Sequence, residues 1–370
     1  MNFEVVHLIT TTDRGGAETQ LLYLTKEQIK QGLHVKVFDL KGSSELDKDF
    51  ASIGIKIDHR LMGKSTLSQI ITFRKFLKKS KKPVIVHCHL PLSEIIATFA
   101  LLRTNFMISS RHFGGRFAPK RNPFLSRIMS VVFSLRAKYV IAISASVKEF
   151  LIQNKEILNN EKIETVHYGF NPQDFRKDLG EFRPVDFTNS FTIGTVARLS
   201  PEKNLQLLIR AFAHLDSEKK YKNRIEKLII VGEGPLHDDL VRLCEQLRIE
   251  NKVNFPGKKD NIALVMNDID LFVLPSFFEG FGMVLVEAMS MNRKIVATDI
   301  SGLREVLGQN GAARLFKSDS LEDLIEKMDM CIEDNMEQIV INQKVQLEKF
   351  TMTHSAAKLY YLYKKTIKLD

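Results

Sequence analysis

The chain has 370 residues, of which 44% are hydrophobic and 26% charged, as is typical of a globular protein with two domains of ordinary size. No apolar run approaches the ~20 residues that span a bilayer, and the first residues lack the basic start and cleavage site of a signal peptide, so we expect a cytoplasmic protein. The net charge of +10 falls in the first half, because residues 1–180 hold 28 Lys or Arg against 16 Asp or Glu, whereas residues 181–370 hold 26 against 28. This uneven charge predicts an anionic partner for the first half.

The first half alternates between short apolar runs and stretches with helical spacing of apolar residues. The predicted strands are residues 4–10, 35–39, 83–87, 106–109 and 139–144, and the predicted helices are residues 18–31, 67–79 and 93–102. Strands separated by helices favour a parallel, doubly wound sheet.

A polar stretch with two prolines, residues 171–189, is predicted to be a linker. The alternation then starts again, with predicted strands at 191–197, 228–231, 253–255, 271–274 and 294–297 and predicted helices at 204–215 and 237–247. We therefore expect an α/β protein of two Rossmann-like domains, residues 1–175 and 185–350, that face each other across a cleft. A last helix within residues 352–370 is compatible with packing back on the first domain.

The clearest chemical signal is the segment PSFFEGFGMVLVEAMSMNRKIVATDISGLREV, residues 275–306. A predicted strand is followed by a turn with Gly280 and Gly282 and then by a helix. The positive end of a helix suits a phosphate group, and glycines let a ligand approach the backbone. Glu279 and Glu287 can accept hydrogen bonds from sugar and ribose hydroxyls. Two glutamates at this spacing are common on solvated helices, so the pair alone does not define a site.

Together with other motifs, this segment closely resembles the donor-binding signature of glycosyltransferase family 4, a retaining family with the GT-B fold. Four further stretches resemble the family's motifs in order and at plausible spacing: GGAE at 15–18, ARLSPEKN at 197–204, VGEGPL at 231–236 and SGLREV at 301–306. The resemblance extends through most of the chain. The donor-binding residues that it implies are Gly15, Gly16, Gly280, Phe281, Gly282, Met283, Val284 and Glu287.

The resemblance also implies roles for the charged residues. Arg198 and Lys203 would neutralise the donor diphosphate, which suits two cations fixed after a strand. Glu279 would orient the sugar ring, and Glu287 would hold the ribose. The sugar would move with retained configuration, the nucleotide would be UDP on family frequency, and no cofactor would be required.

No metal site is expected. Residues 268–270, Asp-Ile-Asp, look like a metal-binding motif, but they precede a buried strand and are structural in the family. Cys88, Cys244 and Cys331 lie far apart and match no zinc or disulfide spacing, so we expect buried thiols.

His112 follows a predicted strand, and the resemblance implies a histidine near the transferred sugar at a comparable place. The next residue is Phe113, where the family often has an acidic residue or glycine. His87 and His89 compete for this role because they also end a strand. A structural histidine is the alternative at each position.

The basic excess of the first half is concentrated at residues 74–82 and 115–136. In the second tract, basic residues lie among apolar ones: Arg116, Lys120, Arg121, Arg127 and Arg136 among Phe117, Phe124, Leu125, Met129 and Phe133. This pattern suits a helix on an anionic membrane, and it also suits a core-facing helix with a solvated basic face. Nucleic acid is not favoured, since no nucleic-acid motif is present.

The sequence therefore predicts a retaining glycosyltransferase that moves a hexose-type sugar from a nucleotide-diphosphate sugar to a glycan or lipid-linked glycan. Such a reaction belongs to the synthesis of cell-surface polysaccharide or glycolipid, on the inner face of the membrane. A nucleotide-sugar 2-epimerase of the same fold and a non-catalytic nucleotide-sugar-binding module are the alternatives.

Overall fold

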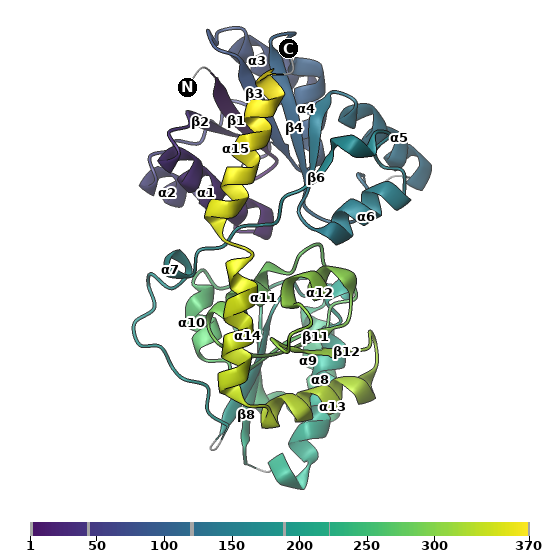
Figure 1. The fold of residues 1–370 in the computed structure, drawn as a ribbon. Helices are drawn as coiled ribbons and strands as arrows, with labels where there is room; N and C mark the ends of the chain where they lie inside the picture. Colours follow the sequence, from purple (N-terminus) through teal and green to yellow (C-terminus); the bar gives the residue numbers. More distant parts are fainter. Residues whose placement is uncertain (1–2, 43–44, 119–121, 188–189, 222, 369–370) are drawn as a thin grey trace. The chain divides into compact units, whose positions relative to one another are not determined.

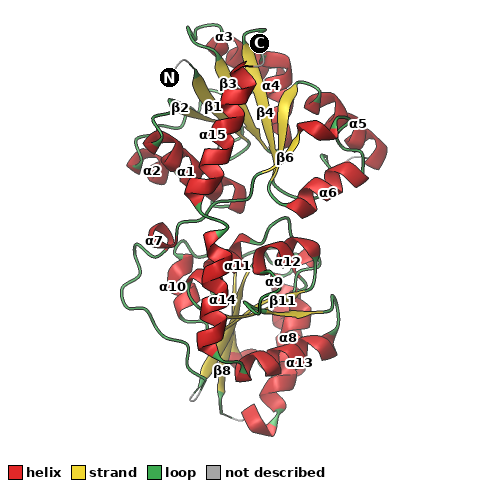
Figure 2. Cartoon of the chain, viewed as in Figure 1, coloured by secondary structure: helices red, strands yellow, loops and turns green. Residues whose placement is uncertain are grey.

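The computed structural model describes residues 3–42, 45–118, 122–187, 190–221 and 223–368. The chain divides into two compact units: unit 1 comprises Met1–Phe170 and Phe350–Asp370, and unit 2 comprises Asn171–Lys349. Each unit is built on a six-stranded sheet with helices packed around it (Figure 1, Figure 2). Within the described part of the chain, every helix is too short or too polar to span a bilayer.

The sheet of unit 1 has the order β2-β1-β3-β4-β5-β6, and each neighbouring pair is parallel. Its strands are β1 (Glu4–Ile9), β2 (Val35–Asp39), β3 (Val84–His89), β4 (Asn105–Arg111), β5 (Ala137–Ala142) and β6 (Ile163–Thr165). Its helices are α1 (Gly16–Lys30), α2 (Asp47–Ser52), α3 (Thr66–Leu77), α4 (Pro91–Ala100), α5 (Pro123–Ser134), α6 (Ala145–Gln153) and α15 (Met352–Lys368). The central strands β3 and β4 are buried along their whole length, as is usual when helices cover both faces of a parallel sheet.

The C-terminal helix α15 completes the core of unit 1. Its buried residues Met352, Leu359 and Tyr363 pack in one cluster with Val5 of β1 and Ile85 of β3. Figure 1 shows this helix, in yellow, lying beside α1. The core of unit 1 is therefore made from the two ends of its sequence.

The sheet of unit 2 has the order β12-β11-β10-β7-β8-β9, again with parallel neighbours. Its strands are β7 (Phe191–Val196), β8 (Ile225–Val231), β9 (Val253–Asn254), β10 (Leu271–Leu274), β11 (Lys294–Thr298) and β12 (Arg314–Phe316). Its helices are α7 (Pro172–Phe175), α8 (Leu205–Ser217), α9 (His237–Leu247), α10 (Ile262–Asn267), α11 (Met283–Ser290), α12 (Ser301–Leu307), α13 (Leu321–Glu333) and α14 (Met336–Glu348). A single-turn 3-10 helix, η2 (Pro201–Lys203), precedes α8.

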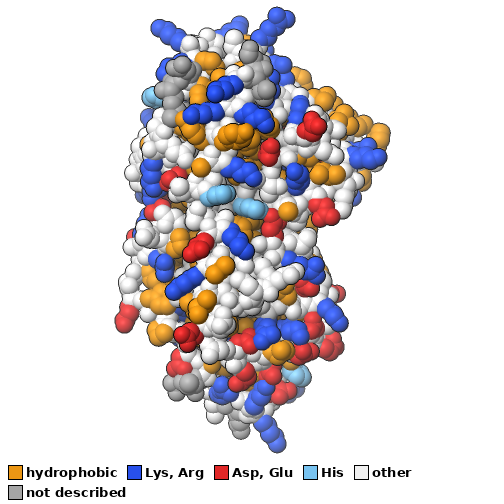
Figure 3. Space-filling model, viewed as in Figure 1, with side chains coloured by type: hydrophobic (Ala, Val, Ile, Leu, Met, Phe, Trp, Pro, Cys, Tyr) orange, Lys and Arg blue, Asp and Glu red, His pale blue; other side chains and the backbone are white. Residues whose placement is uncertain are grey.

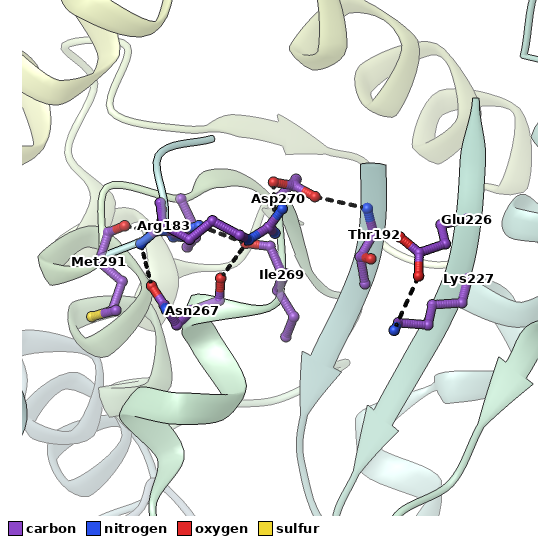
Figure 4. A network of polar contacts seen from close by, with 9 residues as sticks. Arg183, Thr192, Glu226, Lys227, Asn267, Ile269, Asp270 and Met291 are labelled. Carbon is purple, nitrogen blue, oxygen red and sulfur yellow. Dashed lines mark hydrogen bonds and ion pairs between the residues drawn. The ribbon is translucent and has the colours of Figure 1, made fainter. Parts of the chain in front are cut away.

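The described part of the segment predicted to be a linker belongs to unit 2, and its Arg183 contacts residues beside the sheet (Figure 4). The Arg183 guanidinium donates to the Asn267 carbonyl at 3.0 Å and to the Asp270 carboxylate at 2.9 Å. Asp270 also accepts the Thr192 N–H at 2.8 Å, whereas Asp268 is exposed. The Asp270 carboxylate thus connects β7 and the start of β10 to the segment that holds Arg183, which is a structural role.

Candidate active site

The basic motif at residues 197–204 connects β7 to α8 in unit 2. Two glycines after β8 let this connection pack against the neighbouring turn. A Cβ on Gly232 would lie 2.0 Å from the Ala197 carbonyl oxygen, and a Cβ on Gly234 would lie 2.3 Å from that of Leu199. Gly232 also has a φ of 139°, which other residues rarely adopt. This packing fixes the backbone on both sides of the arginine of the motif.

Arg198 and Lys203 of this motif lie in different environments. Arg198 is exposed, and its guanidinium makes no hydrogen bond or ion pair with any residue that the structure describes. Lys203 is partly buried, and its Nζ lies 2.6 Å from Glu279 Oε1. Ser276 Oγ donates to the same oxygen at 2.9 Å. Glu279 is therefore held through Oε1, while its Oε2 accepts no hydrogen bond from a described residue.

A glycine-containing turn connects β10 to α11. The Phe277 N–H donates to the Glu202 carbonyl at 2.9 Å, which joins this turn to η2. Gly282 precedes α11 with a φ of 76°, and a Cβ there would lie 2.7 Å from Leu303 of α12. The other predicted donor residues of the turn are buried or half-buried: Gly280, Phe281, Met283 and Val284. The helix predicted here thus begins at Met283.

Glu287 lies on the second turn of α11, with a half-buried side chain. Its carboxylate makes no hydrogen bond or ion pair with a described residue. Loss of hydration raises the pKa of Glu287 to about 7, because burial disfavours the charged form. A ligand that donates hydroxyl hydrogen bonds would stabilise the ionised carboxylate.

The predicted donor residues of unit 2 therefore offer complementary groups to one kind of ligand. Arg198 and Lys203 supply positive charge, and the start of α11 adds the positive end of a helix. Glu279 and Glu287 supply acceptors for hydroxyl groups. A nucleotide-diphosphate sugar carries both an anionic diphosphate and hydroxyl groups.

The Gly15–Gly16 turn lies in unit 1 at the start of α1. A Cβ on Gly15 would lie 2.5 Å from Glu18 Oε2, and Thr11 Oγ1 donates to Glu18 Oε1 at 3.2 Å. The Glu18 carboxylate thus folds back over the first turn of its own helix. A phosphate bound here would share the positive end of α1 with this carboxylate.

His112 follows β4 and lines a small cavity of unit 1 together with His87, His89 and Tyr168. Both of its ring nitrogens are engaged: Nδ1 lies 2.5 Å from Tyr168 Oη, and Nε2 lies 3.2 Å from His89 Nδ1. Burial lowers the pKa of His112 to about 3, so the ring is neutral at pH 7. His87 and His89, which competed with His112 in the sequence, are its neighbours in one cluster.

The basic tract after β4 includes α5, whose exposed face is apolar. Its buried residues include three serines at four-residue spacing, Ser126, Ser130 and Ser134. Its exposed side chains are apolar or basic: Phe124, Leu125, Arg127, Ile128 and Val132. Arg116 is exposed before the helix, whereas Lys120 and Arg121 lie outside the described residues. Figure 3 shows hydrophobic and basic side chains gathered on the α5 part of unit 1.

The structure divides the apolar residues of this tract between the core and the surface. Phe117 and Phe133 are buried in unit 1, so they do not belong to an exposed apolar face. The inward side of α5 is made of three serines and Phe133, so the solvated side carries Arg127 together with large apolar side chains and is not purely basic.

Sequence reasoning missed two polar residues of these sites, Ser276 and Tyr168. Ser276 comes two residues after β10, and Tyr168 comes three residues after β6. The carboxyl ends of parallel strands are where ligands usually bind in such sheets, so a search for polar residues after each strand finds both.

Comparison with solved structures defines the class of the fold. The crystal structure of Anabaena HepE in complex with UDP superposes with a TM-score of 0.80 over 98% of this chain and 100% of that chain, at 19% identity. Two parallel six-stranded sheets with flanking helices, matched over the whole chain, define the GT-B fold.

Family models identify the family. The model described as Glycosyltransferase Family 4 matches residues 14–174, and the model described as Glycosyl transferases group 1 matches residues 181–347. Together they span most of the chain. The chain therefore belongs to the group 1 and family 4 glycosyltransferases.

Two curated relatives come from Campylobacter jejuni. N-acetylgalactosamine-N,N'-diacetylbacillosaminyl-diphospho-undecaprenol 4-alpha-N-acetylgalactosaminyltransferase is 30% identical over 58% of this chain and 57% of its own length. This chain thus matches little more than half of that relative. GalNAc-alpha-(1->4)-GalNAc-alpha-(1->3)-diNAcBac-PP-undecaprenol alpha-1,4-N-acetyl-D-galactosaminyltransferase is 25% identical over 95% of each chain.

Proposed function

We propose that this protein transfers a sugar from a nucleotide-diphosphate sugar to a glycan or lipid-linked glycan. The observation that carries the proposal is the state of Glu279, which Lys203 and Ser276 hold through Oε1 while Oε2 accepts no hydrogen bond from a described residue. A carboxylate held in this way can orient a sugar hydroxyl. The relatives named for transfer to undecaprenol-linked glycans support a lipid-linked acceptor.

The donor diphosphate would interact with the basic motif. Lys203 has three N–H donors and uses one on Glu279, and Arg198 brings a planar guanidinium that suits two phosphate oxygens. These cations would stabilise the negative charge that grows on the diphosphate as its bond to the sugar breaks. The complex of Anabaena HepE with UDP supports a uridine nucleotide as the first donor to test.

The proposed reaction retains the configuration at the sugar C1. The bond from C1 to the leaving phosphate oxygen breaks, and a bond from C1 to the acceptor oxygen forms on the same face. The acceptor proton moves to the leaving phosphate oxygen. A product of inverted configuration would exclude this scheme.

We propose further that no divalent metal is required, since Arg198, Lys203 and the start of α11 supply positive charge to the diphosphate. Transfer measured after dialysis against EDTA should equal transfer in the presence of Mg²⁺. Loss of activity in EDTA that Mg²⁺ or Mn²⁺ restores would contradict this part of the proposal.

We propose that α5 binds an anionic membrane surface and that the protein meets its lipid-linked acceptor there. Phe124, Leu125, Ile128 and Val132 expose large apolar side chains, and Arg127 lies among them. An exposed apolar patch next to basic residues is suited to the headgroup region of an anionic bilayer.

Vesicle flotation tests this surface. The protein should float with vesicles that contain 30% phosphatidylglycerol and remain behind with phosphatidylcholine alone. Replacing Ile128 and Val132 with serine should abolish flotation. The matched control replaces Ile341 and Val345, which are similarly exposed on α14, and should float normally. Equal flotation of both double variants would remove the membrane role.

The transferase itself is tested in two steps. A thermal-shift screen of UDP-, GDP- and ADP-sugars identifies the donor, because a ligand that binds the folded state raises the melting temperature. Transfer to a lipid-linked glycan is then compared between wild type and Glu279→Gln, which should lose at least ~100-fold in kcat. Donor turnover without an acceptor would indicate an epimerase, and binding without turnover would indicate a binding module.

A further inference from the structure

Four histidines lie together in unit 1, three of them buried and the fourth, His112, half-buried. His7 is on β1, His87 and His89 are on β3, and His112 directly follows β4. His7 pairs in register with His87, and its ring lies 5.1 Å from the rings of both His87 and His89. The His112 ring lies 5.3 Å from that of His89. The cluster thus reaches from the middle of the sheet to the cavity after β4.

Hydrogen bonds connect three of these rings in a line. Tyr168 Oη is 2.5 Å from His112 Nδ1, and His112 Nε2 is 3.2 Å from His89 Nδ1. His89 Nε2 is 2.9 Å from His7 Nδ1, and His7 Nε2 is 2.8 Å from Gln28 Oε1. We call these five residues, Tyr168, His112, His89, His7 and Gln28, the histidine chain.

Gln28 gives the histidine chain a direction. Its Nε2 donates to Tyr363 Oη at 3.1 Å, so its Oε1 is the atom that meets His7 and must accept the His7 Nε2–H. A neutral imidazole has one N–H, so His7 Nδ1 accepts from His89 Nε2–H. By the same rule His89 Nδ1 accepts from His112 Nε2–H.

The direction holds while the rings are neutral. Burial lowers the pKa of His7 to about 4 and that of His112 to about 3, and it lowers the pKa of His89 well below its usual value. A charged ring would carry two N–H donors and would break the sequence of donor and acceptor. At neutral pH each ring therefore offers one donor and one acceptor.

A metal ion is the competing explanation, because nitrogens of His7, His87 and His89 lie within 4.8 Å of one another. The rings of His87 and His89 are stacked, with centroids 4.4 Å apart and planes at 27°, so their in-plane lone pairs do not converge on one point. His87 also uses both nitrogens, with Tyr363 Oη and Ser110 Oγ each at 2.7 Å. The hydrogen bonds account for the cluster without an ion.

We propose that Gln28 is a positioning residue that sets the tautomer of His112 through His7 and His89. With Nε2–H directed inward, His112 offers its Nδ1 only as an acceptor. Its partner must then be a hydrogen-bond donor, and a hydroxyl group is one. In this structure the donor is the Tyr168 hydroxyl. In the substrate complex, a hydroxyl of the sugar takes its place at His112 Nδ1.

The surroundings of His112 suit a hydroxyl ligand. The cavity that His112 and Tyr168 line has a volume of about 40 Å³, enough for a few water molecules or a hydroxymethyl group. The identity of the hydroxyl rests on the proposed transferase function, whereas the tautomer does not. A protein without transferase activity can therefore still have the Nε2–H form of His112, and the reverse also holds.

Imidazole 15N NMR of histidine-labelled protein tests the tautomer directly. Protonated and unprotonated ring nitrogens of a neutral imidazole resonate far apart, so the spectrum reports which nitrogen carries the proton. We expect the Nε2–H form for His7, His89 and His112 at pH 7. An Nδ1–H or a charged ring at His112 would overturn the proposal.

Substitution of Gln28 tests its control of His112. Gln28→Met removes the acceptor of the His7 N–H, and a buried donor without a partner is costly, so the histidine chain should reverse and His112 should become Nδ1–H. Gln69→Met is the matched control, because Gln69 is also a buried glutamine of unit 1 but donates to the Leu40 and Leu61 carbonyls. It should leave the His112 signals unchanged.

Further outcomes decide the proposal. Tyr168→Phe should keep the Nε2–H form of His112, since the tautomer is set from the Gln28 end. Unchanged His112 signals in folded Gln28→Met would refute the role of Gln28.

A 1:1 Zn²⁺ titration that shifts the signals of His7, His87 and His89 would favour the metal site instead. If transfer is established, Gln28→Met should lower kcat/KM about tenfold, the value of one hydrogen bond, and Gln69→Met should leave it unchanged.

Discussion

The Glu287 carboxylate is partly shielded from water in the folded protein and has no hydrogen-bond or ion-pair partner among the described residues. Its pKa is about 7, against 4.5 for an ordinary glutamate, so the folded protein binds a proton that the unfolded chain releases between these values. Stability from this group is therefore greatest at low pH and falls as the pH rises from 4.5 to 7. In the complex, a hydrogen bond donated by a ribose hydroxyl to the ionised carboxylate would offset this loss of stability at higher pH.

Glu287→Gln should stabilise the free protein at high pH and weaken donor binding. The variant's gain in free energy of unfolding over wild type should be larger at pH 8 than at pH 5, by roughly 2 kcal/mol. Urea denaturation at both pH values measures this difference, with the exposed Glu348→Gln as control. A gain that is the same at both pH values would mean that burial does not raise the Glu287 pKa.

Ser276→Ala tests how Glu279 is held. Loss of the 2.9 Å hydrogen bond to Oε1 leaves Lys203 as the partner of this carboxylate in the described structure. We expect kcat for transfer to fall about fivefold, because one hydrogen bond no longer orients the carboxylate. Ser217→Ala, which removes a hydroxyl from the exposed end of α8, should leave kcat unchanged. Equal rates for the two variants would contradict the role of Ser276.

At the scale of elements, the glycines after β8 are needed for backbone packing against the basic motif. Gly232→Ala would place a methyl group 2.0 Å from the Ala197 carbonyl oxygen at a φ of 139°. We expect the free energy of unfolding to fall by about 3 kcal/mol and donor affinity to fall with it. Gly180→Ala, which meets no atom within 4 Å, should change neither quantity measurably. Calorimetry measures the stability of both variants, and donor titration measures their affinity. Equal values for the two variants would contradict the role of Gly232.

The element that sequence reasoning described least well is α5. A pattern of basic and apolar residues shows that a helix is amphipathic, but it does not show which face packs on the sheet. Ser126, Ser130 and Ser134 let α5 lie close to the rest of unit 1, and they face inward with Phe133. Four other large apolar residues of the helix remain exposed: Phe124, Leu125, Ile128 and Val132. Local sequence predicted the helix, and packing decided its rotation.

At the scale of the whole molecule, the stability of unit 1 depends on the last helix of the chain. Leu362→Ala removes a buried side chain of α15 and should lower the free energy of unfolding of unit 1 by about 3 kcal/mol. Hydrogen exchange should then accelerate in β1 and β3, while β10 and β11 of unit 2 keep their protection. Tyr361→Ala, on the exposed side of the same helix, should have no such effect. Equal acceleration in both units would show that they unfold as one.

The sequence by itself determined the parallel α/β sheets, most of the strands, and the glycine turn before α11 in unit 2. These features are local, because a strand, a glycine turn and a helix start each lie within a few neighbouring residues. Only the tertiary structure decided that Glu279 pairs with Lys203, that the apolar side of α5 is exposed, and that Gln28 connects to His112 through His7 and His89. Such contacts join residues far apart in the chain, and they depend on strand order and helix packing, which no local pattern specifies.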